Sequence, residues 1–176
     1  MDEVLVSVDV ETAGPNPRDY SMISIGACLV DQPDHSFYVE LKPTTSAVVP
    51  EALAISGLSM EELERTGVEP ATAMLQFEEW LTALPGERTP VLVAFNAPFD
   101  WMFIDDYFRR FLGRNPFGHA ALDVKAYAMG AMRSTWAETS MRVLSPRFLD
   151  GQPLEHNALS DARDQARLFR ALRNEA

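Results

Sequence analysis

The chain has 176 residues, 47% of them hydrophobic and 23% charged, so it can fill the core of one domain of ordinary size and does not have the composition of a disordered chain. One cysteine, Cys28, excludes an internal disulfide and a cysteine-based zinc site, and its apolar surroundings predict a buried, inert thiol. The net charge of −11 excludes a protein that depends on non-specific, counterion-driven binding to nucleic acid.

The charge is unevenly distributed along the chain. Residues 1–88 hold 16 acids and 4 bases, whereas residues 89–176 hold 10 acids and 11 bases. The chain starts Met-Asp-Glu, unlike the basic start of a signal peptide, and no apolar run approaches the ~20 residues that span a bilayer. We therefore expect a cytoplasmic protein without a membrane partner.

Alternating and apolar patterns predict the elements of the first half of the chain. The valine-rich alternation at 4–10 predicts a strand, and two more are predicted at 22–30 and 36–41. The Gln-Pro-Asp sequence at 32–34 predicts the turn of an antiparallel hairpin. Prolines and glycines favour irregular structure over 42–68.

Helical periodicity dominates the second half. A helix is predicted to begin at Pro70 and to end at Pro85-Gly86. The elements that follow are a strand at 91–95, a helix at 98–112, a strand at 121–124, a helix at 125–132 and a helix from 157 to the end. Residues 133–155, which Pro146 and Pro153 interrupt, show no clear pattern. This order predicts a mixed α/β fold, which by itself names no function.

A pair of carboxylates lies at the end of the first predicted strand. Because strand side chains alternate, Asp9 and Glu11 point to the same face. Two adjacent carboxylates repel unless a cation lies between them, and oxygen ligands suit Mg²⁺ or Mn²⁺. The alternative is a strand end with both acids solvated, and this pair alone does not decide between the two.

Two further acids occur in apolar surroundings. Asp100 lies in the first turn of a predicted helix, where an acid is common for helix-dipole reasons alone, but aromatic residues flank it. Asp161 is predicted in the second turn of the last helix, on the side that faces the sheet, where a carboxylate is costly without a cation. The alternative for Asp161 is a surface pair with Arg163 or Arg167.

Taken together, these residues resemble the three motifs of the DEDD exonucleases. The motifs are Asp-x-Glu-Thr from Asp9, Asn-x-x-Phe-Asp from Asn96, and His-x-Ala-x-x-Asp-Ala from His156. The histidine is typical of the DEDDh, or DnaQ-like, branch. All three motifs in order, across nearly the whole chain, are a far more specific signal than any one of them. The chain departs from the family where histidine often stands, at Phe95 and at Ser56.

The resemblance implies a role for each residue at these positions. Asp9 is expected to bridge two metal ions, Glu11 and Asp161 to complete the shell of the first, and Asp100 to serve the second. His156 is expected to take the proton from the attacking water. The residues expected to contact substrate are Thr12, Leu58, Asn96 and Phe99, and Asp123 is expected to support the site.

The resemblance also implies the fold and the reaction. The expected fold is ribonuclease H-like, a five-stranded mixed sheet with helices on both sides, formed by a single exonuclease domain over 1–176. The expected activity is two-metal 3′→5′ hydrolysis of DNA or RNA, with Mg²⁺ or Mn²⁺ as cofactor and nucleoside 5′-monophosphates as products. The alternatives are a catalytically weak nucleic-acid-binding module and a polymerase-associated proofreading subunit. A homodimer is compatible with the sequence, which does not choose between DNA and RNA.

Overall fold

The computed structural model describes residues 2–84, 88–151 and 156–175 and contains a five-stranded mixed sheet. In space the strands follow the order β3-β2-β1-β4-β5, with β2 antiparallel to β1 and β3, and with β4 and β5 parallel to β1. The strands are β1 (Asp2–Thr12), β2 (Met22–Leu29), β3 (Gln32–Glu40), β4 (Arg88–Ala94) and β5 (Ala121–Asp123). The expected five-stranded mixed sheet is confirmed.

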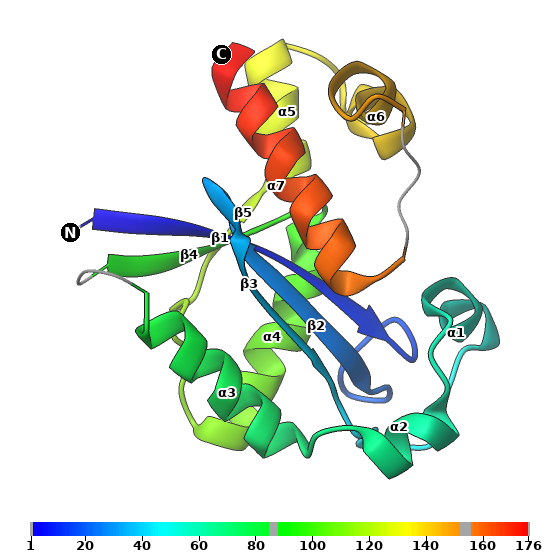
Figure 1. Cartoon of the computed structure of the whole chain (residues 1–176). Helices are drawn as coiled ribbons and strands as arrows, with labels where there is room; N and C mark the ends of the chain where they lie inside the picture. Colours follow the sequence, from blue (N-terminus) through cyan, green and yellow to red (C-terminus); the bar gives the residue numbers. More distant parts are fainter. Residues whose placement is uncertain (1, 85–87, 152–155, 176) are drawn as a thin grey trace.

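Helices cover both faces of this sheet, as expected. In Figure 1, α3 and α4 lie on one face, and α5, α6 and α7 lie on the other. The helical elements are α1 (Pro50–Ser56), α2 (Met60–Thr66), α3 (Pro70–Thr82), α4 (Ala97–Leu112), α5 (Val124–Met132), the 3₁₀ turn η1 (Trp136–Thr139), α6 (Met141–Phe148) and α7 (Ala158–Glu175). None of the helices in the described ranges is long and apolar enough to cross a membrane.

The alternation along β1 divides its side chains between the two faces. The four valines of β1 at positions 4, 6, 8 and 10 are buried in the cluster that includes Phe77 of α3 and Phe108 of α4. Leu5 packs instead against the cluster that includes Phe169 of α7. Because side chains alternate, Asp9 and Glu11 share the face of Leu5, which is the face that α7 covers.

The predicted hairpin turn at 32–34 is wrong by two residues. The turn lies at Val30-Asp31, and residues 32–34 already belong to β3. Pro33 is tolerated there because β3 is the edge strand of the sheet, where a missing backbone N–H leaves no ladder hydrogen bond unmade.

The prediction of irregular structure over 42–68 is also wrong, because α1 and α2 occur there. Pro50 begins α1, and Gly57 ends it in a left-handed conformation with φ of 67°. Ser59 then caps α2 by accepting a hydrogen bond from Glu62 N at 3.4 Å. The residues that suggested a loop are the start and stop signals of two short helices.

The structure also assigns most of 133–155, where the sequence showed no pattern. Residues 136–139 form η1, and residues 141–148 form α6, with Pro146 inside it. The expected stop at Pro85-Gly86 falls outside the described residues. Cys28 is fully buried, as predicted, and burial raises the pKa of its thiol to about 11.

Candidate active site

Three carboxylates from the two ends of the chain meet on the α7 side of the sheet. Asp9 and Glu11 extend from β1, and Asp161 comes from α7. Each offers one carboxylate oxygen, and these oxygens all lie within 4.8 Å of one another. Asp161 lies in the first turn of α7, one turn earlier than predicted, because the helix begins at Ala158. The structure thus brings three of the four acids of the expected ligand set together.

A close approach of α7 to β2 brings Asp161 to Asp9. Gly26 pairs with Asp9 across the β1–β2 ladder. A Cβ added at Gly26 would lie 2.1 Å from the backbone carbonyl carbon of Ala158, so any side chain there would push the start of α7 away. The missing side chain of Gly26 therefore allows the third acid to reach the first two.

Asp100 lies next to β1 and close enough to Asp9 to raise its pKa, although it is not one of the three acids within 4.8 Å of one another. It lies in the first turn of α4, is 4% exposed, and its Oδ1 accepts a hydrogen bond from Val10 N at 3.1 Å. Asn96, which precedes α4, has a left-handed backbone with φ of 65°, a conformation that asparagine tolerates better than most residues. This turn directs the start of α4 toward β1.

The acids of the cluster disfavour one another's ionisation. Burial raises the pKa of Glu11 to about 7, and Asp161 adds to the shift. Burial also raises the pKa of Asp100 to about 8, although the hydrogen bond from Val10 opposes it. The pKa of Asp9 is raised by burial and then by Asp100, Glu11 and Asp161. Such a cluster favours a bound cation, which would relieve the repulsion.

The two arginines named in the alternative for Asp161 each contact another residue. Arg167 forms an ion pair with Asp150 at 2.5 Å. Arg163 donates a hydrogen bond to Ser36 Oγ at 3.2 Å.

Gln165 is a site residue that the motifs did not identify. It is 3% exposed, and its Nε2 donates a hydrogen bond to Asp9 Oδ1 at 2.5 Å. Its Oε1 accepts a hydrogen bond from Phe95 N at 2.8 Å. The signal was present in the sequence, because Gln165 follows Asp161 by four residues and so shares its side of the helix.

Asp123, which the resemblance places in a supporting role, lies between the starts of two helices. Its Oδ1 caps α5 by accepting a hydrogen bond from Ala126 N at 2.6 Å, and its Oδ2 accepts one from Ala97 N at 2.6 Å. One side chain therefore joins the starts of α4 and α5. The arrangement fixes the turn that carries Asp100.

The remaining predicted residues differ in burial and in the contacts they make. His156 is exposed and has a left-handed backbone with φ of 54°, two residues before α7. Thr12 is buried, and its Oγ1 donates to Gly14 O at 2.9 Å. Leu58 packs beside the small cluster of Ala13, Ile23 and Leu63. Phe99 packs on the main core, with its ring 5.4 Å from that of Phe103.

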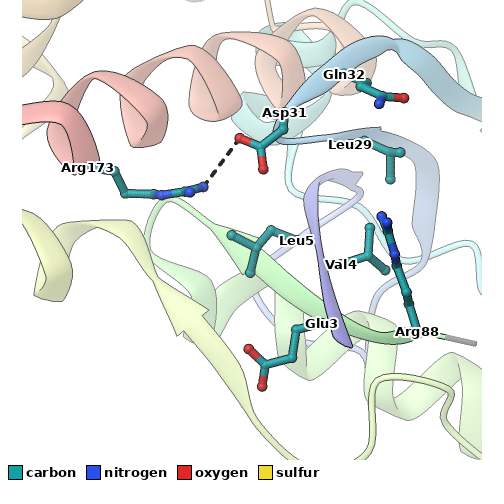
Figure 2. Close-up of a pocket in the computed structure, with 8 residues that line it drawn as sticks. All are labelled: Glu3, Val4, Leu5, Leu29, Asp31, Gln32, Arg88 and Arg173. Carbon is teal, nitrogen blue, oxygen red and sulfur yellow. Dashed lines mark hydrogen bonds and ion pairs between the residues drawn. The ribbon is translucent and has the colours of Figure 1, made fainter. Parts of the chain in front are cut away.

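A cavity of about 250 Å³ lies at the other end of β1 (Figure 2). Glu3, Val4 and Leu5 line it, and an ion pair between Asp31 and Arg173 crosses its rim at 3.4 Å. At ~3.3 Å per residue, Glu3 is about 20 Å along the strand from Asp9. The acidic cluster, in contrast, lies toward the carboxyl ends of the parallel strands, where α/β sheets usually bind ligands.

The mixed sheet therefore carries a group of acids near the carboxyl ends of its parallel strands, with helices on both faces. The sequence profile of the RNase T exonuclease family matches residues 6–169. The chain therefore belongs to the RNase T exonuclease family, and it is a 3′→5′ exonuclease.

Similar proteins agree with this assignment. The chain is 46% identical to the 3′-5′ DNA exonuclease Cap18 of Escherichia coli over 97% of this chain and 91% of that protein. It is 30% identical to ribonuclease T of Shigella boydii over 93% of this chain and 81% of that enzyme.

The fold also matches solved structures. The nuclease domain of 3′hExo, a DEDDh family member bound to rAMP, superposes with a TM-score of 0.76 at 15% identity, over 98% of this chain and 93% of that one. Exonuclease I of E. coli, in complex with a dT13 oligonucleotide carrying a 5cy group, gives a TM-score of 0.70 at 18% identity, over 96% of this chain and 40% of that one. These likenesses confirm the predicted ribonuclease H-like fold.

Proposed function

We propose that this chain, a single exonuclease domain, removes nucleotides from the 3′ end of DNA with the help of two divalent metal ions. The convergence of Asp9, Glu11 and Asp161 within 4.8 Å carries this proposal. Acids held this close gain most from cations, and phosphodiester hydrolysis is a reaction to which paired metal ions are well suited.

The donor set fits hard divalent cations. All four side chains offer carboxylate oxygens, which Mg²⁺ and Mn²⁺ prefer, and the pKa values of Glu11 and Asp100 are raised in the protein without metal. We propose that Asp9 contributes to both ions, Glu11 and Asp161 to the first, and Asp100 to the second. Bound metal would supply Lewis-acid stabilisation of the charge that develops on the phosphate and the leaving oxygen.

The residues of this chain then have distinct tasks in hydrolysis. His156 accepts the proton of the attacking water, whose oxygen bonds to phosphorus. The bond from phosphorus to the 3′ oxygen of the preceding nucleotide breaks, and that oxygen takes a proton to become the new 3′ hydroxyl. The released product is a nucleoside 5′-monophosphate. Exposure of His156 to solvent gives the accepted proton a route out.

Four residues are proposed to hold the terminal nucleotide. Thr12 follows Glu11 directly at the end of β1. Asn96 and Phe99 belong to the turn that positions Asp100, and Leu58 lies in the loop between α1 and α2. Leu58 is partly exposed, which leaves part of its side chain available to a base.

DNA is the proposed substrate because the relative at 46% identity is a DNA exonuclease. RNA is the second candidate, which the 30% identity to ribonuclease T favours. Matched 5′-labelled DNA and RNA oligonucleotides, incubated with Mg²⁺ or Mn²⁺, decide between them. We expect a ladder of shortening DNA products, slower loss of RNA, and slower degradation when a phosphate blocks the 3′ end. Release of the 5′ label as the first product would contradict the direction, and full activity in excess EDTA would contradict the metal ions.

The same assay addresses the weak binding module and the polymerase subunit. Fractions from size-exclusion chromatography are assayed without any polymerase, and the elution volume distinguishes a monomer from a homodimer. Turnover by the isolated chain is expected. A chain that binds oligonucleotide yet hydrolyses none, in any fraction, would favour the binding module or the dependent subunit.

A further inference from the structure

The segment formed by α5, η1 and α6, residues 124–149, differs in charge from the rest of the molecule. It holds four bases and one acid in a chain whose net charge is −11. The bases are Lys125, Arg133, Arg142 and Arg147, and the acid is Glu138. This basic segment begins directly after β5, at the sheet edge toward which Asp9 and Glu11 lie.

The basic segment also exposes large apolar side chains. Of the seven large hydrophobic residues that are exposed in the described structure, three belong to it: Met129, Trp136 and Val143. Trp136 is 52% exposed, the largest aromatic ring among the seven. An exposed indole in a cationic region is unusual for a surface with no ligand, because burial of such a ring is strongly favourable.

Lys125 lies between two aromatic rings. Its Nζ is 4.3 Å from the ring centroid of Trp136 and 5.7 Å from that of Phe95. No carboxylate in the described ranges lies within ion-pair distance of Lys125, whereas Arg147 is paired with Glu175. The ammonium group thus lies beside a half-exposed ring, and we call Lys125 and Trp136 the stacking patch.

The stacking patch is connected to the acidic cluster through a short series of contacts. Lys125 contacts Phe95, and Phe95 N donates to Gln165, which in turn donates to Asp9. Lys125 also follows Asp123 by two residues, and Asp123 holds the start of α4. The patch therefore lies next to the proposed reaction centre, on the same edge of the sheet.

The backbone around Trp136 is held by a capping box. Glu138 Oε2 accepts hydrogen bonds from both Thr135 N and Thr135 Oγ1, each at 2.8 Å. These hydrogen bonds lower the pKa of Glu138. The only acid of the basic segment is therefore engaged with Thr135. Trp136 is thus presented by a fixed turn, which reduces the entropy lost when a planar ligand stacks on it.

We propose that the stacking patch binds the single-stranded part of the substrate upstream of the scissile bond, with a nucleobase on Trp136 and a backbone phosphate on Lys125. This inference rests on the proposed function, because that function supplies the polyanionic strand. An aromatic ring beside a cation is the general arrangement by which proteins bind single strands without reading their sequence. A protein partner or a second copy would not require the excess of bases around the ring.

Substrate length provides the test. Steady-state kinetics are measured on a thymidylate dodecamer and on the thymidylate dinucleotide, which is too short to reach the patch. Trp136→Ala should raise KM for the dodecamer about tenfold, with a much smaller change for the dinucleotide, whereas Trp136→Phe should retain most of the affinity. Lys125→Ala should reduce the slope of log Kd against log salt by about 0.7, the contribution of one phosphate contact. Lys125→Arg should restore that slope.

Matched controls come from the opposite face of the sheet. Arg114→Ala removes one positive charge where Arg114 pairs with Glu78 of α3, and Leu75→Ala removes an exposed apolar side chain of α3. Neither should alter the dependence on substrate length. Equal losses on dodecamer and dinucleotide, or an unchanged salt slope in Lys125→Ala, would overturn the proposal. A Trp136→Ala variant with a changed elution volume and an unchanged KM would also overturn the proposal. It would indicate that Trp136 contacts a protein instead.

Fluorescence anisotropy of a labelled dodecamer separates this inference from the proposed function. If the parent hydrolyses neither substrate, the proposed function fails, but binding can still be compared among the same variants. Weaker binding by Trp136→Ala and Lys125→Ala than by the two controls would then support the patch alone. Equal binding by all variants would overturn it.

Discussion

The side-chain amide of Gln165 connects Asp9 to the backbone at the end of β4. Its Oε1 accepts a hydrogen bond from Phe95 N, so its Nε2 is the group that faces Asp9 Oδ1, at 2.5 Å. The hydrogen bond from Phe95 N therefore fixes the orientation of the Gln165 amide, so that its NH₂ group points to Asp9. This hydrogen bond favours the ionised form of Asp9 and lowers its pKa, against burial and the three neighbouring acids that raise it.

Replacement of Gln165 is therefore expected to weaken the site without touching a proposed ligand. Gln165→Leu should lower manganese affinity and kcat by roughly 10- to 100-fold, the usual effect of removing a hydrogen bond that orients a metal ligand. Isothermal titration with Mn²⁺ measures the affinity. Gln76→Leu, at an exposed position of α3, is the matched control and should change neither quantity. Normal manganese affinity in Gln165→Leu would show that Asp9 needs no such support.

The pH dependence of stability should reveal the acidic cluster. The pKa values of Glu11 and Asp100 are raised to about 7 and about 8, above their ordinary values of 4.5 and 3.8. The folded chain therefore keeps protons that the unfolded chain releases, so in EDTA its free energy of unfolding should fall as pH rises from about 4 to about 8. Thermal melts across this range measure the loss. With Mn²⁺ the trend should reverse, because metal binds the deprotonated ligands; stability in EDTA that rises with pH would contradict the cluster.

Removal of one charge from the cluster should separate stability from activity. Asp161→Asn keeps nearly the same shape and removes a charge that raises the pKa of Glu11. Without metal the variant should be as stable as the parent or more so, should gain less from Mn²⁺, and should lose nearly all nuclease activity. Asp34→Asn, at an exposed position of β3, is the control. If Asp161→Asn reduced stability and left the manganese response unchanged, the assignment of Asp161 as a ligand would be wrong.

Two glycines provide a matched pair for the packing of α7. Gly26→Ala should destabilise the protein by about 1–3 kcal/mol and lower activity, because the added methyl group would displace Ala158 and with it Asp161. Gly130→Ala has open space in α5 and should stabilise by ~0.5–1 kcal/mol, because alanine favours a helix more than glycine does. Urea unfolding measures both. A Gly26→Ala protein with parental stability and activity would show that α7 does not need this close approach.

His156 is expected to act in proton transfer without holding metal. His156→Ala should lower kcat by roughly 10²–10⁴-fold, the usual contribution of a positioned general base. The stabilisation of the variant by Mn²⁺ should be that of the parent, because the proposed ligands are all carboxylates. His119→Ala, at an exposed position after Gly118, is the control. Near-normal turnover under saturating substrate would remove His156 from the mechanism.

Local sequence determined the fold class and most of the proposed site. Alternation along 4–10 placed Asp9 and Glu11 on one face, and helical periodicity placed Asp161 on the side of α7 that faces the sheet. These features depend on residue order alone, because a strand repeats every two residues and a helix every 3.6. The sequence therefore predicted which acids share a face before any contact was known.

Only the tertiary structure decided how these acids meet and what supports them. The contact between Gly26 and Ala158 joins residues 132 positions apart, and the bond from Gln165 to Asp9 joins residues 156 positions apart. The tolerance of Pro33 within β3 likewise depends on its being the edge strand. Local patterns cannot specify such features, because close approach, hydrogen-bond pairing and edge position depend on how distant segments pack, and packing is decided by the whole chain.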